Sequence, residues 1–444
     1  NTMLQIKPYL RSVLETDLSD AILLSATGWT SIQNEGQDIT GEISLVRKHA
    51  LPGLLYFDRD EEISETLHFR LRFYGEEILR LKISRRPERF VDAGPMLEWD
   101  PQLEIQPGLS AETGSGWRVD SRQAWVSYEP GRIAPVFSPD GQAVLSVQAE
   151  DHFVANLFDS LPVVCLERED GRTLVGIAFH LLPGEHLCGT GERFERPDLA
   201  GQQIDLINFD AAGVNNSRAY KNIPFLLSSR GYGLFMHSSA KMRLDLGAHS
   251  SRALQWLVED DELDLFIIGG CKPERILQNY QRITGKPAMP PEWSFGVWMS
   301  RSTYFSADEV SEVARRMRVE GYPADVLHLD TGWFEKDWFC NWKFNPVTFP
   351  EPQKFIDDLA KQGFRISLWQ YPHVRPEIEQ AAYALEQGFV GEETEASHRH
   401  WLGYTIDFTK PEAVRWYQSL LAPLLEMGAA IIKADFAEEV DEGA

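Results

Sequence analysis

The sequence pattern changes near Pro287, and this change constrains the fold more than any other feature of the chain. Before it, short runs alternate between apolar and polar residues and are separated by Gly, Pro, Asn and Asp. A period of two is typical of antiparallel strands with one buried face. The clearest runs are 67–74, 143–149, 173–179 and 232–237. We therefore predict a β-sandwich over residues 1–285, long enough to be a large or doubled one.

After Pro287, buried-strand patterns alternate with amphipathic helix patterns. Strands are predicted at 295–300, 325–330, 365–370 and 430–436, and helices at 307–321, 351–362, 376–387 and 411–427. Ser306 is in position to cap the first helix. This order predicts parallel strands joined by right-handed connections, in a doubly wound sheet or a barrel. No Gly-rich phosphate loop opens these helices, which disfavours a nucleotide-binding sheet. If the fold is an eight-unit barrel, residues 286–444 hold about its first half.

The charge balance narrows the classes of partner. Lys and Arg number 43 against 67 Asp and Glu, a net charge of −24. Such a charge repels nucleic acid and anionic lipid, so we expect neither nucleic-acid nor membrane partners. The four cysteines are scattered, and no secretory pattern opens the sequence. We therefore expect a cytoplasmic protein without a disulfide framework or a metal site.

Candidate catalytic side chains follow the predicted strands. Asp330 ends the second strand, Trp369 nearly ends the third, and Lys433 and Asp435 end the fourth. In a parallel barrel the catalytic groups lie at this rim. Alternation along a strand places Lys433 on the same side as Asp435, and likewise His328 with Asp330. A neighbouring Lys433 would keep Asp435 ionised, as a nucleophilic carboxylate requires. The alternative is a structural salt bridge at the end of a strand.

Seven motifs in order resemble glycoside hydrolase family 31, and within it the bacterial α-xylosidase branch. They begin in the predicted sandwich and continue to the fourth predicted strand. The motifs are Gly189–Phe194, Asn208–Asp210, Tyr220–Phe225, Trp293–Trp298, His328–Asp330, Phe344–Pro350 and Lys433–Phe436. The resemblance implies a multidomain β plus α/β protein, in which an N-terminal β-sandwich precedes a (β/α)8 TIM barrel. The implied activity is that of a retaining α-glycoside hydrolase. Such an enzyme needs no cofactor and acts on a small oligosaccharide or glycoside.

The same resemblance implies roles for individual residues. Asp435 matches the nucleophile and Lys433 its charged neighbour. Asp330 matches the carboxylate that binds sugar hydroxyls in the −1 subsite, Trp369 an aromatic wall there, and Asp210 a residue that reaches toward the +1 side. Further substrate-binding candidates in the matching motifs and beside them are His328, Trp298, Thr303, Thr331 and Gly332.

The family's acid/base follows the nucleophile at a greater distance than the remaining residues allow. Only Glu438, Glu439, Asp441 and Glu442 follow Asp435, so we expect this sequence alone to be inactive. By analogy with relatives, the protein is a candidate homo-oligomer.

Specificity is where the sequence departs from its relatives. The pair Thr331-Gly332 stands where the α-xylosidases carry Cys-Phe and the α-glucosidases Ile-Asp. Gly332 lacks both a bulky filler and a hydrogen-bonding group, and Thr303 replaces an aromatic residue. We therefore predict a roomier −1 subsite. The nearest activity is that of an α-xylosidase, with α-glucosidase or α-galactosidase specificity close behind.

Other functions of the scaffold stay open. A transglycosylase or an α-glucan lyase would share the nucleophile, and a non-catalytic carbohydrate-binding protein is a third class. His398 and His400 have a metal-ligand spacing, but no third ligand is evident.

Overall fold

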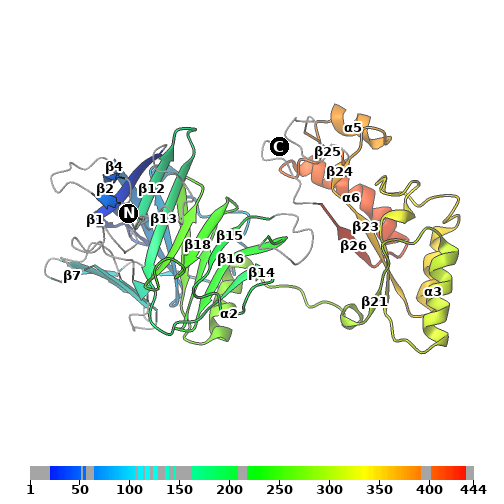
Figure 1. Cartoon of the computed structure of the whole chain (residues 1–444), viewed down its shortest axis with the longest axis horizontal. Coiled ribbons are helices and arrows are strands. Elements are labelled where there is room, and N and C mark those ends of the chain that lie inside the picture. Colours follow the sequence, from blue (N-terminus) through cyan, green and yellow to red (C-terminus); the bar gives the residue numbers. More distant parts are fainter. Residues whose placement is uncertain are drawn as a thin grey trace, which may run out of the picture. The chain divides into compact units, whose positions relative to one another are not determined.

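The computed structural model describes residues 21–51, 54–56, 65–106, 109–113, 116–120, 124–128, 136–139, 145–146, 163–208, 218–391 and 402–436. The chain divides into two compact units, Asn1–Pro287 and Ala288–Ala444. Strands dominate the first unit, whereas strands alternate with helices in the second (Figure 1).

The first unit consists of antiparallel strands and one α-helix in its described part. The strands are β1 (Ala21–Asn34), β2 (Asp38–Leu51), β3 (Leu54–Tyr56), β4 (Glu65–Tyr74), β5 (Ile78–Ser84), β6 (Ile105–Gln106), β7 (Leu109–Thr113), β8 (Gly116–Asp120), β9 (Ala124–Tyr128), β10 (Val136–Pro139), β11 (Leu145–Ser146), β12 (Val163–Arg168), β13 (Thr173–His180), β14 (Leu187–Glu192), β15 (Gln203–Leu206), β16 (Lys221–Ser228), β17 (Tyr232–Met236), β18 (Met242–Leu246), β19 (Ala253–Val258) and β20 (Glu262–Ile268). The helices are the short 3-10 helix η2 (Pro87–Arg89) and α2 (Pro273–Thr284).

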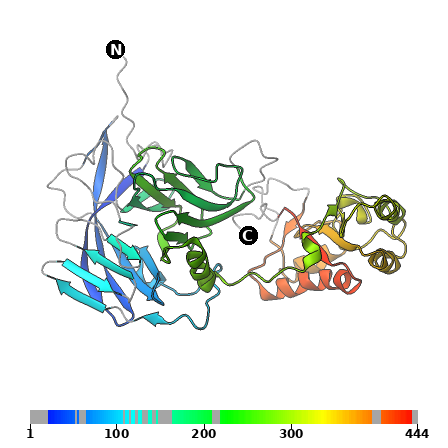
Figure 2. The same ribbon diagram turned by 90° about the horizontal axis from the view of Figure 1, so that it is seen from below.

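Most of these strands form one long sheet that bends over on itself. Its order is β14-β16-β17-β20-β5-β4-β2-β1-β12-β13-β19-β18-β15, with β3 beside β2 and β6 beside β4. β13 also touches β20, and β15 touches β16, although neither pair is adjacent in this order. The two layers enclose an apolar core (Figure 2). A second sheet, in the order β11-β10-β9-β8-β7, contributes Phe137 to that core. The fold therefore confirms the predicted sandwich.

Alternation along β4 and β5 separates two kinds of buried surface. Leu67, Phe69, Leu71 and Phe73 of β4 belong to the apolar core. The alternate residues of β4 and β5 turn to the opposite face of the sheet, because successive side chains of a strand point to opposite sides. These alternate residues include four cationic side chains that are also buried: Arg70, Arg72, Arg80 and Lys82.

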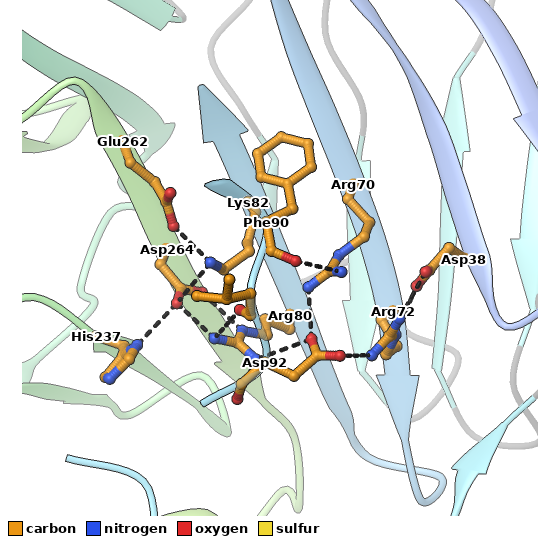
Figure 3. A network of polar contacts seen from close by, with 11 residues as sticks. Asp38, Arg70, Arg72, Arg80, Lys82, Phe90, Asp92, His237, Glu262 and Asp264 are labelled. Atoms are coloured by element: carbon orange, nitrogen blue, oxygen red, sulfur yellow. Dashed lines mark hydrogen bonds and ion pairs between the residues drawn. The ribbon is translucent and has the colours of Figure 1, made fainter. Parts of the chain in front are cut away.

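These cations form a charged network with carboxylates from other segments (Figure 3). The segment after β5 lies over the cations and supplies Asp92, whose carboxylate oxygens are 2.6 Å from Arg70 Nη2 and 2.5 Å from Arg72 Nη1. Asp264 of β20 accepts two hydrogen bonds from Arg80, at 2.8 and 2.6 Å. The remaining carboxylates of the network are those of Asp38 and Glu262. Each buried cation therefore has an anionic partner, which buried charges require.

The second unit alternates strands and helices as the sequence predicts. Its elements are η3 (Glu292–Phe295), β21 (Trp298–Met299), α3 (Ala307–Val319), β22 (Val326–Leu329), η4 (Thr331–Trp333), α4 (Pro352–Lys361), β23 (Arg365–Gln370), β24 (His373–Val374), α5 (Gln380–Glu386), β25 (Tyr404–Thr405), α6 (Pro411–Glu426) and β26 (Ile431–Ala434).

Four of these strands form a parallel sheet in the order β21-β22-β23-β26. The strands lie side by side in the order of the chain, as in the first part of a barrel. Ser306 caps α3, because its side chain accepts a hydrogen bond from the backbone N–H of Glu309. Apolar residues of the helices and of the sheet share one core. No helix in the described ranges is both long and apolar enough to cross a membrane.

Several elements are shorter than predicted, and for two of them the hydrogen bonds show the reason. The expected strand at 295–300 is reduced to β21, because Pro291 opens a 3-10 turn whose N–H groups bond back to Pro291 and Trp293. The expected helix at 376–387 begins only at Gln380, because the preceding residues form turns. In these turns the carbonyls of Arg375 and Ile378 accept hydrogen bonds from the backbone three residues later.

Candidate functional site

The C-terminal ends of the parallel strands bring four predicted site residues together. Asp330 follows β22, Trp369 lies in β23, and Lys433 and Asp435 lie in and directly after β26. Strand pairing places Trp369 opposite Lys433. The carboxyl ends of parallel strands share one edge of a sheet, which is where the active sites of barrels form.

Asp435 is held at both of its carboxylate oxygens. The indole N–H of Trp369 donates to Oδ2 over 2.7 Å, and the ammonium of Lys433 lies 3.3 Å from the same oxygen. Oδ1 accepts a hydrogen bond of 3.1 Å from the backbone N–H of Phe436. The backbone N–H of Asp435 donates to the carbonyl of Gln370 and extends the pairing of β23 and β26. The arrangement holds the carboxylate beside a positive charge, with a partner on each of its oxygens.

Asp330 shares Lys433 with Asp435. Its Oδ2 is 3.4 Å from Lys433 Nζ and 2.9 Å from His328 Nε2, and its Oδ1 accepts from the N–H of Thr331. Burial raises the pKa of Asp330, but the hydrogen bond from His328 and the charge of Lys433 outweigh it, so the pKa lies below its usual value. Alternation therefore placed both pairs correctly, His328 with Asp330 and Lys433 with Asp435.

Four of the substrate-binding candidates are buried, and two of these, His328 and Trp369, bond to the carboxylates. His328 is 8% exposed, and its second ring nitrogen lies 2.9 Å from Ser367 Oγ, so the ring joins Asp330 to the neighbouring strand. Trp369 is 1% exposed and packs against the rings of Trp338, Tyr371 and Phe436. Their predicted contacts with sugar stay predictions. What the structure shows is that both hold carboxylates in place.

The prediction of free space at Gly332 is wrong. A Cβ added there would lie 2.5 Å from Thr303 Oγ1, 2.8 Å from the carbonyl oxygen of Tyr304 and 3.1 Å from Phe305 Cδ1. The N–H of Gly332 donates to Thr303 Oγ1 over 2.6 Å, which draws the segment 303–305 against it. Thr331 is also enclosed, at 2% exposed, and its hydroxyl donates to Asp337 Oδ1. The missing side chain therefore makes room for a neighbouring loop.

The loop after β22 supplies aromatic residues that the sequence leaves unplaced. Trp333 is buried and donates to the carbonyl of Trp369, and Trp342 is buried and donates to Gln370 Oε1. Trp338 is 42% exposed, and its ring lies edge-on to Trp369 at 5.5 Å. Trp338 is thus the residue of this group that combines exposure with contact to the cluster around Asp435. The high frequency of Trp between residues 333 and 342 points to this loop, but spacing in the sequence does not show which of the indole rings is exposed.

Several predictions concern other parts of the chain. Trp298 lies on β21 and is 42% exposed. Asp210, His398 and His400 lie outside the described residues, as do the acidic residues after Asp435. Cys340 is buried, and burial raises the pKa of its thiol to about 12, as expected of a packing residue. Within the described ranges, no group of three or more His, Cys, Asp or Glu side chains is placed to hold a metal ion.

Comparison with known proteins places this geometry in a family. The model of the glycosyl hydrolase family 31 TIM-barrel domain matches residues 287–443. The model of the glycosyl hydrolase 31 N-terminal galactose mutarotase-like domain matches residues 68–245. The chain belongs to glycoside hydrolase family 31. The two matched domains correspond to the bent sandwich and to the parallel sheet that carries Asp435.

Among curated relatives, α-xylosidases of this family are similar to the chain. It is 33% identical to an α-xylosidase of Emericella nidulans over 264 residues, which are 58% of this chain and 34% of the relative. It is 32% identical to the α-xylosidase XylQ of Lactiplantibacillus pentosus over 264 residues, with the same coverage of 58% and 34%. An α-glucosidase of Saccharolobus solfataricus is 27% identical over 274 residues, 58% of this chain and 38% of that protein.

Solved structures of the family share the fold. A dextranase of Flavobacterium johnsoniae in complex with glucose superposes with a TM-score of 0.77 at 22% identity, over 95% of this chain and 49% of that one. An α-xylosidase from a soil metagenome in complex with xylose gives 0.73 at 20% identity, over 92% and 58%. The chain thus spans about a third of the length of the curated α-xylosidases and about half of these structures.

Proposed function

We propose that this chain carries the nucleophile and part of the −1 subsite of a retaining α-glycoside hydrolase that prefers α-xylosides. The observation that carries the proposal is the cluster at the strand ends. Asp435 is fixed by Trp369, Lys433 and its own neighbouring N–H, and Asp330 stands on the other side of the same lysine.

Each member of the cluster has a chemical task in this reaction. The carboxylate of Asp435 attacks the anomeric carbon, and the bond from that carbon to the leaving oxygen breaks as an ester bond to Asp435 forms. A carboxylic acid roughly 5–5.5 Å from the nucleophile protonates the leaving oxygen and later activates the water that cleaves the ester. The second displacement returns the anomeric carbon to its starting configuration.

Asp330 suits the binding of sugar hydroxyls. Its lowered pKa keeps it ionised at neutral pH, and His328 holds its orientation, so it is a fixed acceptor. Hydrogen bonds to an ionised acceptor are stronger than bonds between neutral groups. A hydrogen bond from a sugar hydroxyl to Asp330 accelerates the reaction most if it becomes stronger as charge develops on the sugar in the transition state.

The preference for xylosides rests on two supports. The α-xylosidases at 33% and 32% identity are similar to this chain over 58% of its length. The segment 303–305 occupies the space beside Gly332, which leaves less room there for the C6 group of a hexose. The α-glucosidase at 27% identity makes α-glucosides the second candidate substrate class.

A hydrolysis screen tests the proposal. The full-length protein is assayed with aryl α-xyloside, α-glucoside and α-galactoside, and the first product anomer is identified by NMR. We expect the α-xyloside to have the highest kcat/KM and the α-anomer to appear first. Asp435→Ala should abolish turnover. Hydrolysis that Asp435→Ala leaves unchanged would overturn the proposed nucleophile, and a β-anomer would overturn the retaining mechanism.

A further inference from the structure

A buried imidazole lies behind the candidate nucleophile and is not accounted for by the proposed reaction. His373, the first residue of β24, is 1% exposed. Its Nε2 lies 3.0 Å from the backbone carbonyl oxygen of Phe436, the residue that follows Asp435. On the sequence alone, this histidine is as compatible with a solvated loop as with a cleft.

The contacts fix which nitrogen carries the proton. A carbonyl oxygen can only accept a hydrogen bond, so Nε2 of His373 must be the donor. Its Nδ1 lies 3.4 Å from Thr405 Oγ1 on the paired strand β25, and a hydroxyl can donate to an unprotonated nitrogen. The imidazole is therefore held between β25 and the residue after the nucleophile.

That residue has an unusual backbone. Phe436 has a φ of 55°, in the left-handed region that a side chain with a Cβ disfavours. The N–H of this residue donates to Oδ1 of Asp435, at 3.1 Å. Without an external contact on its carbonyl, the backbone at Phe436 would gain free energy by leaving this conformation, and the residue that carries this N–H could shift.

We propose that His373 is a positioning residue for the nucleophile. Its Nε2–H holds the carbonyl of Phe436 and so fixes the place of this strained residue, whose N–H donates to Oδ1 of Asp435. Trp369 holds the other oxygen, so His373 and Trp369 together set the rotation of the carboxylate. This inference rests on the proposed function, because it concerns how Asp435 is aimed.

Two polar replacements separate positioning from packing. The side-chain amide of His373→Gln reaches the place of Nε2 and can still donate to Phe436, whereas that of His373→Asn reaches only the place of Nδ1. We expect kcat of the full-length protein to fall about 10- to 100-fold in His373→Asn and to stay within about threefold in His373→Gln. KM should stay within about twofold in both, because His373 is not expected to contact sugar.

A trapping rate isolates the attack by Asp435. A 5-fluoro-glycosyl fluoride of the preferred sugar loses fluoride without proton transfer, so the rate of its adduct with Asp435, followed by mass spectrometry, does not depend on the acid/base. This rate should fall in His373→Asn and recover in His373→Gln. Tyr417→Phe is the matched control, since it removes a half-buried hydroxyl of α6 that is bonded to Gln370 Oε1. We expect its trapping rate to be that of the wild type.

The outcomes separate this inference from the proposed function. Equal trapping rates in the Asn and Gln variants, whether normal or reduced, would overturn the role of His373. A wild-type protein that neither hydrolyses the glycosides nor forms the adduct would overturn the proposed function itself.

Discussion

Asp264 is the carboxylate at the centre of the charged network of the sandwich, and its replacement by Asn is a quantitative test of how that network stabilises the fold. The side chain of Asp264 is 4% exposed. It accepts from Arg80 Nε and Nη2 at 2.8 and 2.6 Å, and His237 Nδ1 lies 2.8 Å from its Oδ2 (Figure 3). Asn keeps the shape but has one acceptor oxygen and no charge.

The magnitude follows from the burial of the partner. Arg80 has a side chain only 1% exposed, so it cannot turn to solvent when its carboxylate is removed. Removing one partner of a buried ion pair lowers the free energy of unfolding by about 3–5 kcal/mol. Arg80 keeps a contact of 3.5 Å with Asp92 Oδ1 and a bond to the carbonyl of Asp92. We therefore expect a loss near the lower end, about 3 kcal/mol.

The assay is urea unfolding of the chain with and without the substitution. A matched control exists on the same sheet, where Asp205 forms a similar two-bonded pair with Arg243, at 2.5 and 3.0 Å. The side chain of Asp205 is 45% exposed, so Asp205→Asn should cost less than about 1 kcal/mol. Equal losses in the two variants would refute the argument that burial sets the magnitude.

The stabilisation by Asp264 should also depend on pH. Burial raises the pKa of Asp264, but the hydrogen bonds from Arg80 and His237 outweigh it, and the pKa lies below its usual value. A group with a lowered folded pKa stabilises the fold above its unfolded pKa of about 3.9, and this contribution disappears as the pH falls through the folded pKa. The stability gap between wild type and Asp264→Asn should thus be constant above about pH 5 and narrow below about pH 4.

Three further predictions concern the strand-end site. Gly332→Ala should lower the free energy of unfolding by about 1–3 kcal/mol. Thr303→Ala in the same chain should restore part of this loss, because Thr303 Oγ1 is the nearest atom to the added methyl. Full additivity of the two substitutions in a double-mutant cycle would contradict the contact. Lys433→Met removes a charge that lowers the pKa of Asp330. In the full-length protein it should reduce kcat/KM by about 100-fold and move the acid limb of the pH profile upward; an unmoved acid limb would show that Asp330 does not titrate there. The 444-residue chain assayed by itself should form the adduct with a 5-fluoro-glycosyl fluoride yet leave aryl glycosides intact, and turnover of an aryl glycoside would contradict the expectation that the acid/base lies elsewhere.

Local pattern was sufficient for the existence and order of the elements of the second unit and for pairs two residues apart at a strand end. The predicted strand at 365–370 matches β23, and the predicted helix at 411–427 differs from α6 by one residue. The side-by-side placement of Lys433 and Asp435 follows from the period of a strand, which is why the sequence alone could predict it. Their contact at 3.3 Å confirms it.

Contacts between strands could not be read in the same way. The bond from Trp369 to Asp435 depends on the pairing of β23 with β26, and a shift of one residue would turn the indole to the other face. The space beside Gly332 depends on a loop 29 residues earlier in the chain. Arg70 and Arg72 alternate with apolar residues as exposed strand residues would, yet both are buried and both pair with Asp92, at least 20 residues further along the chain.

Lys433 lies almost equally far from two carboxylates, 3.3 Å from Asp435 and 3.4 Å from Asp330. During the proposed reaction one of these negative charges vanishes, because Asp435 becomes a neutral ester. The attraction of the lysine then falls on Asp330 alone. Formation of the covalent intermediate would in this way tighten the contact between Lys433 and Asp330 while the aglycone departs, and hydrolysis of the ester would loosen it again. A cation shared by the two carboxylates can thus couple the release of the sugar to the hydrolysis of the ester.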